Sequence, residues 1–140
     1  MQLKEIEKSL PNGFHDALLS SIEIDYASRK IIIKLQILVG NPDGEDYVKR
    51  NEYRSAILTV SDFLYIAMEP PNVSQAFREP KELLIDGGEP EAGKAPLSLI
   101  ALDQLPAGAF AYWFYSSRTN SFIHIAAQNA SLDWRSTKKE

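Results

Sequence analysis

The residues near the start of the chain that are best suited to chemistry are His15 and Asp16, which stand side by side in the stretch PNGFHDALLSS. An imidazole that titrates near neutral pH can exchange protons or bind a metal. Some metal phosphohydrolases place such a His-Asp pair on a helix, but their centres need further ligands. The chain contains one other histidine, His124, so a metal or catalytic site would have to combine His15, Asp16 and His124.

A structural role explains the same stretch more simply. Phe14 can insert into a core, and Asp16 can accept hydrogen bonds from nearby backbone N–H groups. No local spacing brings His15 and His124 together, so we expect no metal and no other cofactor. The alternative is a small hydrolase or phosphodiesterase that uses His15, Asp16 and His124, with the two histidines facing one cleft.

Two further stretches carry residue types that are common in binding surfaces. The segment AYWFYSSRTNSF combines aromatic rings with arginine and asparagine, and these types are frequent in protein-binding hot spots. The loop NPDGEDY is acidic but lacks the spacing of a calcium-binding EF-hand, so we interpret it as a solvated turn. The candidate contact residues are Trp113, Tyr115, Arg118, Asn120, Asp43 and Asp46.

Composition limits the class of protein. The chain has 140 residues, of which 44% are hydrophobic and 24% charged, so we expect one folded domain over residues 1–140. It contains no cysteine, which excludes thiol nucleophiles, thiolate metal sites and disulfides. A formal net charge of −4 without a basic stripe argues against nucleic-acid binding. Neither a signal peptide nor a membrane-spanning run is apparent, so we expect a cytoplasmic protein.

Apolar residues mostly recur at every second position, which is typical of β-strands. Residues 18–26 and 30–39 alternate in this way around a short turn and predict a β-hairpin. Shorter strands are expected at 56–60, 63–68 and 83–85, and a second hairpin should join 109–115 to 121–127. With another apolar alternation at 97–105, the pattern predicts about eight strands.

These expectations define a mainly β protein. Residues 2–9 predict a short N-terminal helix that ends before Pro11. The strands after it are expected to pair in antiparallel fashion, either as a sheet sandwich or as a partly open barrel. Strand order and oligomeric state do not follow from this pattern.

The chain contains two stretches that are similar to parts of other proteins, NGFHDALLSSIEIDY and WFYSSRTNSFIHIAA followed by LDW. They resemble small uncharacterised bacterial proteins, some of which are similar to immunity proteins of contact-dependent and polymorphic toxin systems. This resemblance implies a cytoplasmic protein that neutralises a toxin by binding it, and an acidic surface would suit a basic toxin. We therefore expect a noncatalytic domain whose partner is another protein.

Overall fold

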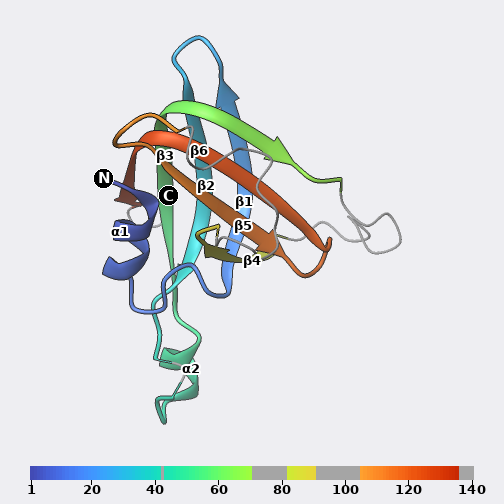
Figure 1. The fold of residues 1–140 in the computed structure, drawn as a ribbon. Coiled ribbons are helices and arrows are strands. Elements are labelled where there is room, and N and C mark those ends of the chain that lie inside the picture. Colours follow the sequence, from blue (N-terminus) through green and yellow to red (C-terminus); the bar gives the residue numbers. More distant parts are fainter. Residues whose placement is uncertain (42, 71–81, 91–104, 136–140) are drawn as a thin grey trace.

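The computed structural model describes residues 1–41, 43–70, 82–90 and 105–135 (Figure 1). It is a mainly β structure with one short helix near the N-terminus and one helical turn between the second and third strands. The elements are α1 (Leu3–Ser9), β1 (Ala17–Asp25), β2 (Lys30–Leu38), α2 (Tyr47–Arg50), β3 (Tyr53–Met68), β4 (Leu83–Gly88), β5 (Phe110–Ser116) and β6 (Ser121–Trp134).

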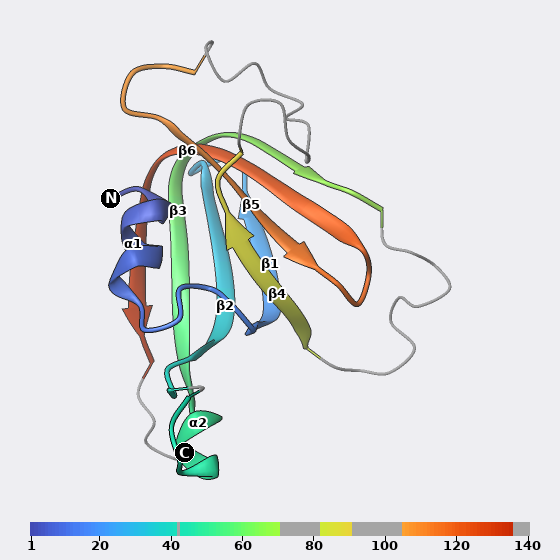
Figure 2. The same cartoon turned by 60° about the horizontal axis from the view of Figure 1, so that its bottom comes forward.

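The strands form a closed antiparallel barrel in the order β1-β2-β3-β6-β5-β4, with β4 pairing back to β1 (Figure 2). The predicted sandwich or partly open barrel is therefore corrected to a closed one, and about eight strands are corrected to the six that the described residues form. The predicted N-terminal helix and both hairpins, β1–β2 and β5–β6, are confirmed. The apolar alternation at 97–104 lies outside the described residues.

The structure has fewer strands than predicted partly because the two strands expected at 56–60 and 63–68 form one strand, β3. Ser61-Asp62 looks like a turn in the sequence, but β3 continues through it with Asp62 in a left-handed conformation at φ 53°. The ladder to β6 continues beyond this point and shifts register between Phe63 and Tyr65. A local irregularity therefore bends a continuous strand without ending it.

A second irregularity changes which side chains of β1 point inward. The sequence places Leu18, Ile22 and Ile24 on one face, but Leu19 is buried and Leu18 is not. The β1–β2 register shifts between Leu19 and Ser21, and Ile22 and Ile24 then pack against the core. This β-bulge reverses the alternation within the strand.

The core fills the inside of the barrel. The predicted inner face of β2 is confirmed, because Ile31, Ile33, Leu35 and Ile37 are all buried. Leu3 and Ile6 of α1 and the following Phe14 join the same cluster. The Phe14 ring meets the rings of Tyr112 and Phe114 edge to face, with centroids 6.0 and 5.3 Å away. The N-terminal segment thus contributes to the core as well as covering it.

The barrel closes at its shortest ladder, the β1–β4 seam. Its register runs only from Ala17 opposite Ile85 to Leu19 opposite Leu83. The β3–β6 ladder, by contrast, runs from Ala56 opposite Trp134 to Met68 opposite Ile123. Side chains just outside the short ladder therefore have a larger share in holding β1 and β4 together.

Candidate functional site

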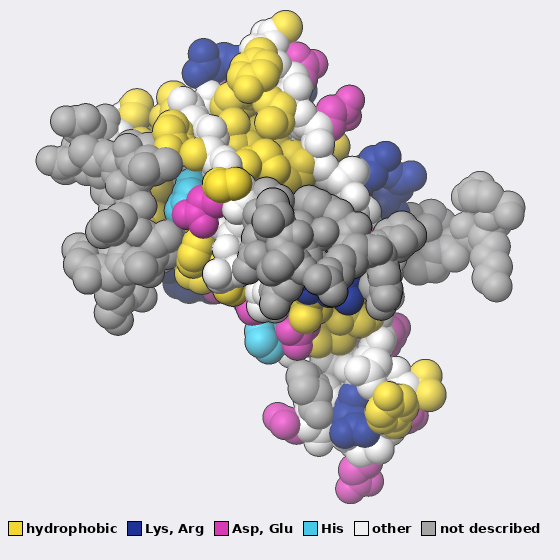
Figure 3. Space-filling model, turned by 90° about the vertical axis from the view of Figure 1, so that its right-hand side faces the viewer, with side chains coloured by type: hydrophobic (Ala, Val, Ile, Leu, Met, Phe, Trp, Pro, Cys, Tyr) yellow, Lys and Arg dark blue, Asp and Glu magenta, His cyan; other side chains and the backbone are white. Residues whose placement is uncertain are grey.

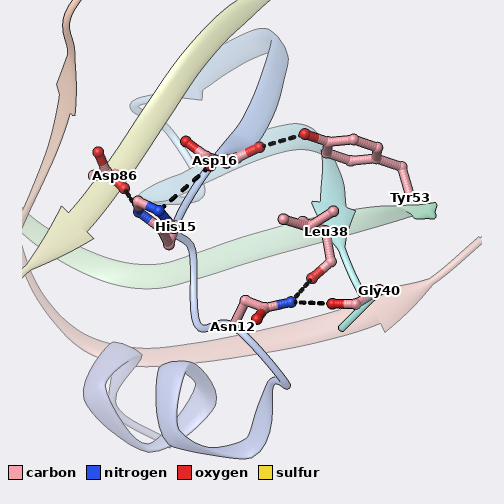
Figure 4. Close-up of polar contacts among 7 residues, drawn as sticks. All are labelled: Asn12, His15, Asp16, Leu38, Gly40, Tyr53 and Asp86. Atoms are coloured by element: carbon pink, nitrogen blue, oxygen red, sulfur yellow. Dashed lines mark hydrogen bonds and ion pairs between the residues drawn. The ribbon is translucent and has the colours of Figure 1, made fainter. Parts of the chain in front are cut away.

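His15 and Asp16 lie at one end of the β1–β4 seam, where they meet Asp86 of β4 (Figure 4). The Nδ1 of His15 is 2.5 Å from Oδ1 of Asp86, and its Nε2 is 3.3 Å from Oδ2 of Asp16. The three side chains are 64%, 42% and 47% exposed. We call this group the seam cluster: an imidazole between two carboxylates that come from segments 70 residues apart in sequence.

The turn before β1 sets the position of this cluster. The side-chain amide of Asn12 donates hydrogen bonds to the carbonyls of Leu38 and Gly40, which ties the turn to the end of β2. Asp16 has a left-handed backbone at φ 57°, and its carbonyl accepts a hydrogen bond from the Tyr53 hydroxyl at 2.9 Å. This conformation is uncommon for residues other than glycine, although Asp tolerates it better than most. The hydrogen bond from Tyr53 involves the backbone carbonyl of Asp16, so it does not test the expectation that the Asp16 side chain accepts hydrogen bonds from nearby backbone N–H groups. That structural role of Asp16 remains a prediction.

Electrostatics favour the charged form of His15. The hydrogen bond to the Asp86 carboxylate is the main cause that raises the pKa of the His15 imidazole; burial opposes it, and the charges of Asp16 and Asp86 raise the pKa further. Because the side chain is largely exposed, solvent screens this interaction. The seam cluster is therefore an exposed ion pair when His15 is protonated.

The other histidine occupies a separate place. His124 lies on β6, its side chain is 9% exposed, and its Nε2 is 3.3 Å from Oε2 of Glu69. It lies opposite Trp113 of β5, whereas Asp86 of β4 lies opposite Tyr115. Strand β5 therefore separates β6 from β4, whose backbones are about 10 Å apart at two strand spacings. The structure therefore brings His15 and Asp16 together with Asp86 and not with His124. Figure 3 shows the two imidazoles at separate places on one face of the molecule.

Trp113 and Tyr115 lie on the outer face of the barrel. They alternate along β5 with the buried Tyr112 and Phe114, and the Phe122 ring of β6 lies beside them. The Phe122 centroid is 5.5 Å from the Trp113 ring and 4.6 Å from the Tyr115 ring. We call Trp113, Tyr115 and Phe122 the outer patch.

Polar groups border the outer patch. At one end the exposed Asn120 accepts a hydrogen bond from the Tyr115 hydroxyl at 2.7 Å through its Oδ1. Arg118 is exposed in the same β5–β6 turn, and its guanidinium lies 3.5 Å from the backbone carbonyl of Glu82. On the other side the Glu69 carboxylate accepts a hydrogen bond from the Phe122 backbone N–H at 3.0 Å. Three of the six predicted contact residues, Trp113, Tyr115 and Asn120, thus lie on one surface, and Arg118 lies in the turn that borders it.

Asp43 and Asp46 lie elsewhere. The Asp46 carboxylate caps α2 and accepts a hydrogen bond from the Val48 backbone N–H at 3.0 Å, while the Asp43 backbone N–H donates to the Asn41 side chain. Both views place α2 far from the β5–β6 turn (Figures 1 and 2). The acidic loop therefore shares no surface with the outer patch.

Sequence reasoning missed two acidic partners, Asp86 and Glu69. Asp86 follows the predicted strand 83–85 and precedes two glycines, a context that indicated a loop, whereas β4 extends through Gly88. The two glycines could have indicated that other side chains pack closely against this segment, because glycine inside a strand often marks a close approach of other atoms. Here an added Cβ on Gly87 would lie 2.7 Å from the Tyr112 hydroxyl oxygen, and one on Gly88 would lie 2.5 Å from the Trp113 ring.

Comparisons of this chain with models of protein families, with curated proteins and with solved structures find no match. Within the described part of the chain, none of the helices has the length and apolar character needed to cross a membrane.

Proposed function

We propose that this chain is a noncatalytic protein-binding domain that acts in the cytoplasm as a toxin-neutralising immunity protein, and that the outer patch is its contact surface. The observation that carries the proposal is the position of Trp113, Tyr115 and Phe122 outside a barrel whose interior is already filled by Tyr112 and Phe114. The core does not require aromatic rings on the outer face. A binding function gives them a role.

The composition of this surface supports a protein partner. Protein-binding hot spots combine aromatic anchors with arginine and are surrounded by a polar rim. Here the rings are the anchors, and Arg118, Asn120 and Glu69 form the rim. The net charge of −4 suits a basic partner, because opposite charge accelerates association and disfavours acidic competitors. The immunity role itself comes from the resemblance of two sequence stretches and extends this binding function.

The separation of the histidines weighs against the hydrolase alternative. Paired acid–base catalysis needs both groups within reach of one substrate, either directly or through one water. His15 interacts with Asp16 and Asp86, whereas His124 interacts with Glu69 two strands further round the barrel. No specific observation favours hydrolysis, so binding is the function that we propose.

The proposal is tested with the proteins encoded by the genes on either side of the one encoding this chain. We expect one of them to form a stoichiometric complex, measured by calorimetry. Trp113→Ala should weaken that complex at least about 30-fold, as the loss of a hot-spot side chain does. The matched control is Tyr47→Ala, because Tyr47 is an aromatic residue 71% exposed on α2, far from the outer patch.

Two results would contradict the proposal. If neither neighbouring protein binds, the immunity role fails. If Tyr47→Ala weakens the complex as much as Trp113→Ala does, the outer patch is not the contact surface. The melting temperature of each variant is measured alone, so that a loss of binding is not confused with a loss of folding.

A further inference from the structure

We propose that the seam cluster is a binding site for a divalent transition-metal ion of the zinc type, which ties β1 to β4. One ligand atom from each of His15, Asp16 and Asp86 can be chosen so that all three lie within 4.8 Å of one another. This inference is independent of the protein-binding function and differs from our sequence-based expectation of no metal.

The chemistry of the donors selects the class of ion. The set contains one imidazole nitrogen and two carboxylate oxygens. Calcium and magnesium prefer oxygen ligands throughout, whereas zinc and related ions accept mixed nitrogen and oxygen ligands. Three protein ligands with a fourth position left to water are a common arrangement for zinc. A zinc-type ion therefore fits the cluster better than a harder cation does.

The charge of the seam cluster also favours binding of a divalent cation. Among residues 1–41, 43–70, 82–90 and 105–135, the only cationic side chain that pairs with Asp16 or Asp86 is His15. When His15 is neutral, two carboxylates remain close together without a compensating charge from the described residues. A divalent cation would supply that charge and offset their mutual repulsion.

The backbone holds the ligands in place, while their side chains are free to adjust. Asp86 is fixed in the β4–β5 ladder opposite Tyr115, and Asp16 is fixed by the Tyr53 hydroxyl. The imidazole now directs one nitrogen to each carboxylate, so both carboxylates must turn toward a single nitrogen for an ion to bind (Figure 4). The ligand side chains are exposed enough for such rotations to occur without repacking the core.

A bound ion would have a structural effect at the seam. The β1–β4 ladder extends only from Ala17–Ile85 to Leu19–Leu83, and its other end is flanked by the hydrogen bond from the Ser20 hydroxyl to Glu82. A metal held by His15, Asp16 and Asp86 would fasten the end that lies before Ala17. Because the ligands come together only in the folded chain, binding should also raise the melting temperature.

The test titrates the chelator-treated full chain with zinc chloride by calorimetry and with cobalt chloride by visible absorption. We expect one zinc ion per chain, a visible cobalt band typical of low-coordinate sites, and a higher melting temperature with zinc. Asp86→Asn removes one ligand with little change of shape and should weaken binding at least about tenfold. The matched control is Glu69→Gln, which makes the same kind of change beside His124 and should leave the affinity unchanged.

The proposal is overturned if zinc at 100 times the protein concentration gives neither heat nor a thermal shift. It is also overturned if Asp86→Asn binds as tightly as the parent chain, or if Glu69→Gln is the variant that loses binding. Should Asp86→Asn not fold, His15→Gln replaces it, because His15 is the most exposed ligand and contributes least to the core. Binding that survives His15→Gln unchanged would again exclude the site.

Discussion

Along β5, aromatic side chains alternate between the inside and the outside of the barrel. Tyr112 and Phe114 are each 1% exposed and pack around Phe14, whereas Trp113 and Tyr115 are half-buried beside Phe122 on the outer face. The residue types are nearly the same, but their surroundings differ. Position within the pleat, and not residue type, separates side chains that hold the fold together from those available to a partner.

Alanine variants of two neighbouring residues on β5 should differ strongly in their free energy of unfolding. Phe114→Ala should lower the free energy of unfolding by about 3–5 kcal/mol, because it leaves a cavity in the core. Tyr115→Ala should lower it by about 1 kcal/mol or less, since the outer ring contacts solvent as well as Phe122. Urea denaturation of both variants measures the difference. Equal losses would mean that the outer ring is as much a part of the core as the inner one.

We expect a smaller difference in stability between alanine variants of the two glycines of β4. The added methyl of Gly87→Ala would press on Tyr112, which is enclosed and donates a hydrogen bond to the Glu7 carboxylate, so we expect a loss of about 1–3 kcal/mol. The methyl of Gly88→Ala would press on Trp113, whose ring can move toward solvent, so the loss should be smaller.

Thermal unfolding ranks these two variants, and tryptophan fluorescence reports movement of the Trp113 ring. The reverse order of stability, or an unchanged spectrum for Gly88→Ala, would contradict this account of the two faces.

The seam cluster should make stability depend on pH, by less than the changes in stability expected for the preceding variants. Asp86 and Asp16 raise the pKa of His15 above its usual 6.5, so protonation of His15 favours the folded state. This stabilisation is fully present below the unfolded-state pKa and is lost as the pH rises through the higher folded-state pKa. Because His15 is mostly exposed, we expect less than about 1 kcal/mol.

Unfolding measured between pH 5 and 8 with a chelator present should therefore show a small decline in the parent chain that His15→Gln lacks. A decline of the same size in His15→Gln would assign the effect to other groups.

Much of the fold follows from the sequence where the alternation is regular. The inner face of β2 could be predicted because the period of two is unbroken from Ile31 to Ile37, and the pairing of β5 with β6 could be predicted because the turn between them is short. The irregular strands could not be predicted as well. The bulge after Leu19 looks like an ordinary polar position in the sequence, and Asp62 looks like part of a turn, yet both lie within a continuous strand and change its ladder.

The candidate site was predictable only in part. The sequence predicts Trp113 and Tyr115 as contact residues because aromatic residues stand near Arg118 and Asn120 within one short segment. The partner of His15 was not identified, because Asp86 comes to it through closure of the barrel across 71 residues of sequence. Local patterns report neighbours along the chain, whereas the β1–β4 seam depends on the order of all six strands.

The long pairing of β3 with β6 has a consequence for synthesis of the chain. β3 ends at residue 68, but the strand that covers its edge is complete only at residue 134. At 5–20 residues per second, the ribosome needs about 3 to 13 s to make the intervening stretch. During that interval a nascent chain presents an uncovered strand edge to its surroundings, so chaperone supply during translation should influence the yield of folded protein.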